Sequence, residues 1–158
     1  MVEVPATIIQ IADLAQRADF ISIGSNDLTQ YLLAVDRNNT RVADLYSAYH
    51  PSVLRAVRYV VNEVHRVGKT VSICGEMAGD PGTAILLMAM SFDSLSMSAS
   101  NLLKVRKTIC HTPLSEAKLL LDEVLAYDNP VQIRATVEAK LTALGLIDLI
   151  RPQGARAS

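Results

Sequence analysis

Residues 18–38 read ADFISIGSNDLTQYLLAVDRN, and this stretch decides the fold. Its mostly apolar run at 20–23 predicts a buried strand that ends at Gly24. Polar residues follow, among them Asn26 and Asp27, and apolar residues then recur at helical spacing. A carboxylate and an amide are therefore expected where a strand ends and a helix begins. Ligands bind at that position in parallel α/β folds, although the same residues also suit an ordinary helix N-cap.

The composition indicates one globular domain. The chain has 158 residues, of which 50% are hydrophobic and 20% are charged, and its net charge is −1. A balanced charge and few aromatic residues give no reason to expect binding to nucleic acid or to a membrane surface. No apolar run reaches the roughly 18 residues of a membrane helix, and the first ten residues carry an acid rather than the basic residues of a signal peptide. A cytoplasmic protein is expected.

The cysteines and histidines predict neither a disulfide nor a zinc site. Cys74 and Cys110 lie far apart in the sequence and form no CxxC pair, so both are expected to be reduced. The three histidines show no metal-ligand spacing with these cysteines.

The fold class expected is α/β, with about four parallel strands alternating with helices and a helical tail. Strands are expected at 2–4, 20–23, 70–74 and 93–97. Helices are expected at 5–17, 28–35, 51–67, 84–90, 102–109, 114–125 and 131–144. The change of character near residue 113 divides the chain into a sheet-forming part at 1–112, C-terminal helices at 113–150 and a frayed tail at 151–158.

Four strand–helix units are too few to close a barrel, because a barrel of this kind needs eight. A small open sheet would also leave costly edges unpaired. The chain is therefore expected to be a piece of a larger protein or to associate with copies of itself.

Five side chains are expected at one rim, since parallel strands bring their carboxyl ends to the same edge. They are Glu3, Asn26, Asp27, Arg37 and Cys74. Two carboxylates suit Mg²⁺, which proteins commonly hold by one or two carboxylates together with a substrate phosphate. An arginine can bind phosphate oxygens in a bidentate way. Taken singly, each acid also suits a solvated or capping position, and the arginine suits an exposed surface.

Cys74 is followed by GEMAGD, which leaves two interpretations open. A cysteine at the end of an apolar strand is commonly a small core residue. Gly75 and Gly79, however, would let the backbone approach a ligand closely. A thiol in that setting could act as a nucleophile or as a proton donor.

Four motifs in this order resemble a known family. They are SIGSNDLTQYLLAVDRNN, HPSVLRAV, GKTVSICGEMAGDP and FDSLSMSAS. They resemble the carboxyl-terminal domain of enzyme I, the phosphoenolpyruvate–protein phosphotransferase of the bacterial phosphotransferase system, over residues 1–110. The segment AYDNPVQIRATVEAKLTALGL resembles the nitrogen-regulatory branch of that family.

The resemblance implies the second half of a phosphoenolpyruvate-binding (β/α)₈ TIM barrel in a homodimeric enzyme. In this family a phosphoryl group passes from phosphoenolpyruvate to a histidine and on to a phosphocarrier protein, and pyruvate is released. By motif match, Glu3 and Asp27 would bind Mg²⁺, while Asn26, Asp27 and Arg37 would bind the substrate. Cys74 would protonate the enolate carbon.

The resemblance is incomplete. The domain that carries the histidine and the first half of the barrel, which supplies two further arginines, are absent from these residues, so the chain alone is expected to be inactive. Ser91 stands where the family usually has glycine, and Leu103 where it usually has proline. Two alternatives remain open: the substrate barrel of pyruvate phosphate dikinase or phosphoenolpyruvate synthase, and a non-catalytic half-barrel that associates with itself.

Overall fold

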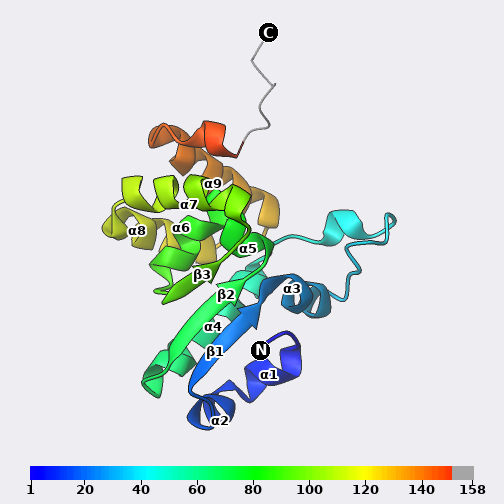
Figure 1. The fold of residues 1–158 in the computed structure, drawn as a ribbon. Coiled ribbons are helices and arrows are strands. Elements are labelled where there is room, and N and C mark those ends of the chain that lie inside the picture. The colour runs from blue at the N-terminus through cyan, green and yellow to red at the C-terminus, as the bar shows by residue number, and fades with distance from the viewer. Residues whose placement is uncertain (151–158) are drawn as a thin grey trace.

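The computed structural model describes residues 1–150, which form a parallel three-stranded sheet surrounded by helices (Figure 1). The strands are β1 (Phe20–Gly24), β2 (Thr70–Cys74) and β3 (Ser94–Ser96), in the order β1–β2–β3. Both pairings are parallel, so the three strands end at the same edge. The α/β class and the parallel sheet expected from the sequence are confirmed.

The strand expected at 2–4 is reduced to one parallel bridge between Val2 and Ile23. The Val2 N–H donates to the Ser22 carbonyl at 2.7 Å, and the Gly24 N–H donates to the Val2 carbonyl at 3.0 Å. Helix α1 begins at Pro5, so the extended backbone ends after only a few residues. The prediction of four strands was therefore wrong by one, although Val2 does run along the outer edge of β1.

Nine α-helices are present within residues 1–150. They are α1 (Pro5–Ile9), α2 (Ile11–Gln16), α3 (Ser25–Leu33), α4 (Pro51–Arg66), α5 (Glu76–Gly79), α6 (Pro81–Ala89), α7 (Ala99–His111), α8 (Leu114–Leu125) and α9 (Pro130–Ala143). Two 3₁₀ turns, Ala43–Leu45 and Ile147–Leu149, complete the set.

Most helices expected from the sequence are confirmed, and α8 has the predicted bounds. The single helix expected at 5–17 was wrong, because Gln10 leaves helical geometry at φ −97° and ψ 8° and separates α1 from α2. The one-turn helix α5 was not predicted, since four residues carry no readable periodicity.

One hydrophobic core joins the sheet to the helices. The valine stripe of α4 is fully buried, and it includes Val57, Val60 and Val64. The same cluster contains buried residues of the last two helices, such as Leu120 and Val137. The division at residue 113 stays a prediction, and the expected frayed tail at 151–158 lies outside the described residues.

No helix in the described part of the chain is both long enough and apolar enough to cross a membrane.

A partly buried tyrosine ties the long segment between α3 and α4 to the C-terminal helices. The Tyr49 hydroxyl donates to Asp80 Oδ2 at 2.7 Å, and Asp80 also caps α6 by accepting from the Thr83 N–H. The Arg134 guanidinium of α9 lies over the Tyr49 ring, 5.9 Å from its centroid. Burial raises the pKa of the Tyr49 phenol, and the Asp80 charge raises it further. The phenol therefore remains a neutral donor, which holds this segment in place.

The Asp93 carboxylate joins β2, α4 and the segment before β3 near the amino-terminal ends of the strands. Asp93 Oδ2 accepts from the Val71 N–H at 2.8 Å and lies 2.9 Å from His65 Nε2. The hydrogen bond with His65, and next the one from Val71, hold the pKa of the Asp93 carboxyl below its usual range.

The variant Asp93→Asn keeps an acceptor for the Val71 N–H and removes the charge. Because the folded-state pKa of Asp93 is lowered, its contribution to stability is present above about pH 4 and is lost as pH falls through the folded-state pKa. The side chains of His65 and Asp93 are 35% and 41% exposed. We therefore expect the charge of Asp93 to contribute about 1 kcal/mol or less to the free energy of unfolding.

Calorimetry should accordingly show a melting temperature roughly 1–4 °C lower for Asp93→Asn than for the parent at pH 7. This difference should shrink as pH falls below 4. Asp122→Asn is the matched control, since its carboxylate lies 3.7 Å from Arg58 on an exposed surface. Equal melting temperatures for Asp93→Asn and the parent at pH 7 would contradict this account.

Candidate functional site

An open hollow of about 370 Å³ lies at the carboxyl ends of the strands. Its lining comes from the residues that follow β1, β2 and β3, together with the first turn of α7. The lining residues are Asn26, Cys74, Gly75, Glu76, Ser96, Met97, Ser98 and Asn101. Segments far apart in sequence therefore meet here because the sheet is parallel.

The ends of β1 and β2 are joined by two side chains of α3. Ser25 Oγ donates to the Cys74 carbonyl at 2.7 Å, and Asn26 Oδ1 accepts from the Glu76 N–H at 3.0 Å. Ser25 is buried, so its hydrogen bond is protected from water. We call these two contacts the strand-end clip. The clip fixes the backbone on both sides of Gly75.

Glycine is the only residue type that fits at position 75, between the ends of β1 and β2. Its backbone lies at φ 103° and ψ −164°, a region that is essentially restricted to glycine. A Cβ atom at Gly75 would overlap Ser25 Oγ and would lie 2.9 Å from Asn26 Oδ1. The glycine therefore supplies both a rare backbone conformation and the close approach that the clip requires.

The Cys74 thiol is half-buried and belongs to the hollow rather than to the sealed core. Its Sγ lies 3.6 Å from the Ile23 carbonyl oxygen, to which the thiol can donate weakly. Neither Cys74 nor Cys110 forms a disulfide. The interpretation of Cys74 as a wholly packed core residue is not favoured by this position.

The two predicted metal ligands lie beside the hollow and do not line it. The Glu3 side chain rests against Gly24, with Oε1 2.7 Å from the place that a Cβ of Gly24 would occupy. Asp27 stands in the first turn of α3, directly after Asn26, and its Oδ1 accepts from Gln30 Nε2 at 3.3 Å. Both carboxylates are thus placed at the carboxyl end of β1.

The donor set fits a cation that is shared with a ligand. Among residues 1–150, neither Glu3 nor Asp27 forms an ion pair with a basic side chain, so no basic group competes for their oxygens. In the same part of the chain, no group of three His, Cys, Asp or Glu side chains could hold a metal ion. Two carboxylates suit Mg²⁺ when water and substrate phosphate supply the remaining ligands.

Arg37 approaches the hollow from the segment after α3. Its Nη1 lies 3.0 Å from Glu76 Oε1, and its backbone N–H donates to Gln30 Oε1 at 3.0 Å. Tyr46 is close by: burial raises the pKa of its phenol, and the Glu76 charge contributes, while Thr29 and Arg37 oppose the shift. The predicted substrate-binding arginine therefore does not line the hollow itself, but it is paired with Glu76, which does.

Sequence reasoning missed four polar residues of this site: Glu76, Ser96, Ser98 and Asn101. The signal that could have found them was available, since each lies within or directly after a motif quoted for the resemblance. Residues that follow a strand directly are candidates in any parallel sheet.

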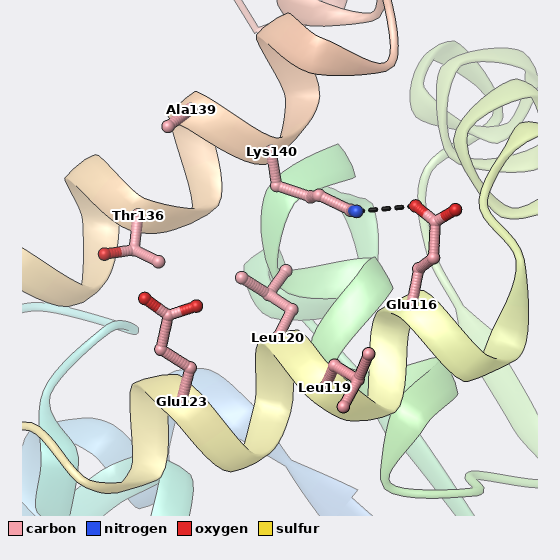
Figure 2. A pocket seen from close by; sticks show the side chains of 7 residues that line it. All are labelled: Glu116, Leu119, Leu120, Glu123, Thr136, Ala139 and Lys140. Carbon is pink, nitrogen blue, oxygen red and sulfur yellow. Dashed lines mark hydrogen bonds and ion pairs between the residues drawn. The ribbon is translucent and has the colours of Figure 1, made fainter.

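A second hollow, of about 320 Å³, lies between α8 and α9 (Figure 2). Figure 2 shows Lys140 pointing across it toward Glu116, with which it forms an ion pair, so this cation is already neutralised. Glu123 accepts from the Tyr127 hydroxyl at 2.8 Å. None of the residues predicted for chemistry lines this hollow.

Comparison with known proteins covers the hollow at the carboxyl ends of the strands. Residues 1–114 match the family described as PEP-utilising enzyme, PEP-binding domain, where PEP is phosphoenolpyruvate. The chain belongs to this family. The matched residues contain all three strands and every residue of the hollow at their carboxyl ends. The resemblance read from the motifs is therefore confirmed at the level of the family.

Three relatives extend the match toward the C-terminal helices. A Salmonella typhimurium protein named phosphoenolpyruvate-dependent phosphotransferase system is 40% identical over 151 residues, which are 96% of this chain and 20% of that protein. The phosphoenolpyruvate-protein phosphotransferase of Buchnera aphidicola is 44% identical over 137 residues, 87% of this chain and 24% of the relative. The phosphoenolpyruvate-protein phosphotransferase of Listeria monocytogenes is 43% identical over 143 residues, which are 90% of this chain and 25% of the relative. The chain thus spans only a fifth to a quarter of these relatives.

The clip can be tested by Gly75→Ala, with Gly68→Ala as control. Both glycines have positive φ, but a Cβ at Gly68 meets nothing within 4 Å. We expect Gly68→Ala to cost about 1 kcal/mol of unfolding free energy, and Gly75→Ala roughly 2–4 kcal/mol because strain and overlap add.

Urea denaturation measures both values, and amide NMR shifts at Asn26 and Glu76 report whether the clip has moved. Equal losses for the two variants, with unchanged shifts at the clip, would show that the close approach at Gly75 is unimportant.

Proposed function

We propose that this chain is the PEP-binding segment of a phosphoenolpyruvate–protein phosphotransferase. That enzyme would pass the phosphoryl group of PEP to a histidine elsewhere in the full protein, and on to a histidine phosphocarrier protein, with release of pyruvate. The observation that carries the proposal is that Asn26 and Cys74 open into one hollow, and that Arg37 is paired with Glu76, which lines the same hollow. The names of the relatives favour this activity over that of a dikinase or a synthase.

Arg37 and Asn26 would bind the anionic substrate. The guanidinium is a planar donor that matches phosphate oxygens, and the Asn26 side chain faces the same hollow while its Oδ1 is fixed by the Glu76 N–H. Phosphoryl transfer depends mainly on positioning and on neutralising charge. A fixed amide and a guanidinium that both contact Glu76 support both requirements.

Glu3 and Asp27 would hold Mg²⁺ together with oxygens of the substrate, with Asp27 serving both. When bound, the cation would supply charge neutralisation to the phosphate and to the enolate. Within the chain, the role of these two residues is to present oxygen donors at the end of β1, where neither is committed to a basic partner among residues 1–150.

Cys74 would donate the proton that converts the enolate to pyruvate. The bond that breaks is S–H and the bond that forms is C–H, and the thiolate is left on the protein. A positioned acid of this kind typically contributes about 10²–10⁴-fold in rate.

The proposal includes the barrel, of which this sheet would be the second half. Support comes from the strictly parallel order and from the exposed edge of the sheet, where Phe20 is 64% exposed. A hollow of about 580 Å³ follows this edge, lined by apolar residues such as Val2, Leu14 and Ile21. Further strands of the full enzyme would cover it. The homodimer and the nitrogen-regulatory branch rest on the family resemblance.

The same exposed edge favours one alternative of a different class. A chain of this length could pair its open edges with those of a second copy and bind no substrate. The two candidates differ in activity once the missing parts of the enzyme are supplied.

A chimera provides those parts, with this chain replacing the matching 143 residues of the Listeria monocytogenes enzyme. We expect the chimera to form pyruvate from PEP, and Cys74→Ala to lower that rate by about 10²–10⁴-fold. Mg²⁺ affinity should be unchanged, because the thiol is not a proposed ligand.

Cys110→Ala is the matched control, since Cys110 is exposed on α7 outside the hollow. It should leave the rate within twofold. A folded chimera that forms no pyruvate would refute the proposed function, and a Cys74→Ala rate within a few fold of the parent would refute the acid role.

A further inference from the structure

The cation proposed for substrate binding already carries an anionic partner. Arg37 Nη1 lies 3.0 Å from Glu76 Oε1, within the range of a charge-assisted hydrogen bond. The Arg37 side chain is 35% exposed and that of Glu76 is 67% exposed, so the pair is open to solvent. Glu76 also lines the hollow that contains Asn26 and Cys74. A carboxylate therefore stands where an anionic ligand would approach.

The backbones of both partners are fixed by other contacts. The Arg37 N–H donates to Gln30 Oε1, and the Glu76 N–H donates to Asn26 Oδ1. Glu76 also follows Gly75, whose conformation is set by close packing against Ser25. Breaking the ion pair therefore requires only side-chain rotation and leaves the loop in place.

A phosphate and the Glu76 carboxylate would compete for Arg37. Two anions that approach the same guanidinium repel each other, and solvent at this exposed position weakens that repulsion. An exposed side chain can rotate into water at little cost, whereas the ligand remains in the hollow. The carboxylate is thus the partner that leaves.

We propose that Glu76 is the resident counter-ion of Arg37 and that an anionic ligand must displace it on binding, an inference that rests on the proposed function. Glu76 acts through Arg37 and is a positioning residue. It keeps the guanidinium beside a lining residue of the hollow in the free protein, and it lowers the affinity of the site for anions by the strength of the pair that is broken.

The size of the effect follows from the exposure of the pair. Exposed pairs of this kind are weak, so their loss should change an equilibrium constant by about twofold to fivefold. Glu76→Gln removes the charge and keeps the shape of the side chain. Glu76→Asp keeps the charge but draws the carboxylate back by one methylene group, which lengthens and weakens its contact with Arg37.

The test is an NMR titration of the chain with phosphoenolpyruvate at a fixed, saturating Mg²⁺ concentration. We expect Glu76→Gln to bind about twofold to fivefold more tightly than the parent, and Glu76→Asp to bind more tightly than the parent as well. Glu63→Gln is the control: it removes an equally charged residue that pairs with Arg66 on α4. Its affinity should match that of the parent.

Each other outcome has a distinct meaning. Parent-like or weaker binding by Glu76→Gln, while the parent binds, would overturn the counter-ion role and leave the proposed function standing. Tighter binding by Glu76→Gln with parent-like binding by Glu76→Asp would show that charge alone matters, which also overturns the pairing. Absence of binding by all four proteins at millimolar ligand would overturn the inference, while the chimera tests the proposed function independently.

Discussion

The site depends on the strand-end clip, in which Ser25 holds the Cys74 carbonyl and Asn26 holds the Glu76 N–H. Each hydrogen bond contributes only about 1 kcal/mol. They matter because each fixes the relative position of two residues that lie far apart in the sequence, 49 positions in one hydrogen bond and 50 in the other. Without the clip, the first turn of α3 would lose its side-chain connection to the residues at the end of β2.

The clip in turn depends on one glycine and one buried sheet. Parallel pairing of β1 with β2 sets Gly24 opposite Cys74, so the residues that follow each strand start at the same level. Gly75 then allows the two turns to touch. The core beneath supplies the rigidity, since Ile23, Ile73 and the valine stripe of α4 are fully buried. Apolar packing thus fixes the positions of the polar side chains of the site.

Much of this arrangement could be predicted from the sequence, and the failures have physical causes. β2 and α8 were predicted with their observed bounds, because an apolar run and a clear helical period are both strong local signals. The predictions of a strand at 2–4 and of one helix at 5–17 were wrong. The number of residues that pair with β1 and the break at Gln10 are both set by tertiary contacts.

Individual site residues were harder to predict than their location. Asn26 and Cys74 were expected at one rim, and they do line one hollow. The pairing of Arg37 with Glu76 was not foreseen, because it joins residues 39 positions apart and has no periodic signature. Side-chain partners of this kind become visible only when the fold is known.

Paramagnetic broadening by Mn²⁺ in place of Mg²⁺, with phosphoenolpyruvate present, tests most directly whether the strand ends form a metal–phosphate site. The account predicts selective broadening of amide NMR signals at Glu3, Asp27 and Cys74, and its loss in Asp27→Asn but not in Asp19→Asn, whose carboxylate is exposed just before β1 begins. Broadening centred on Glu116 and Glu123 of α8, or equal broadening in both variants, would contradict it.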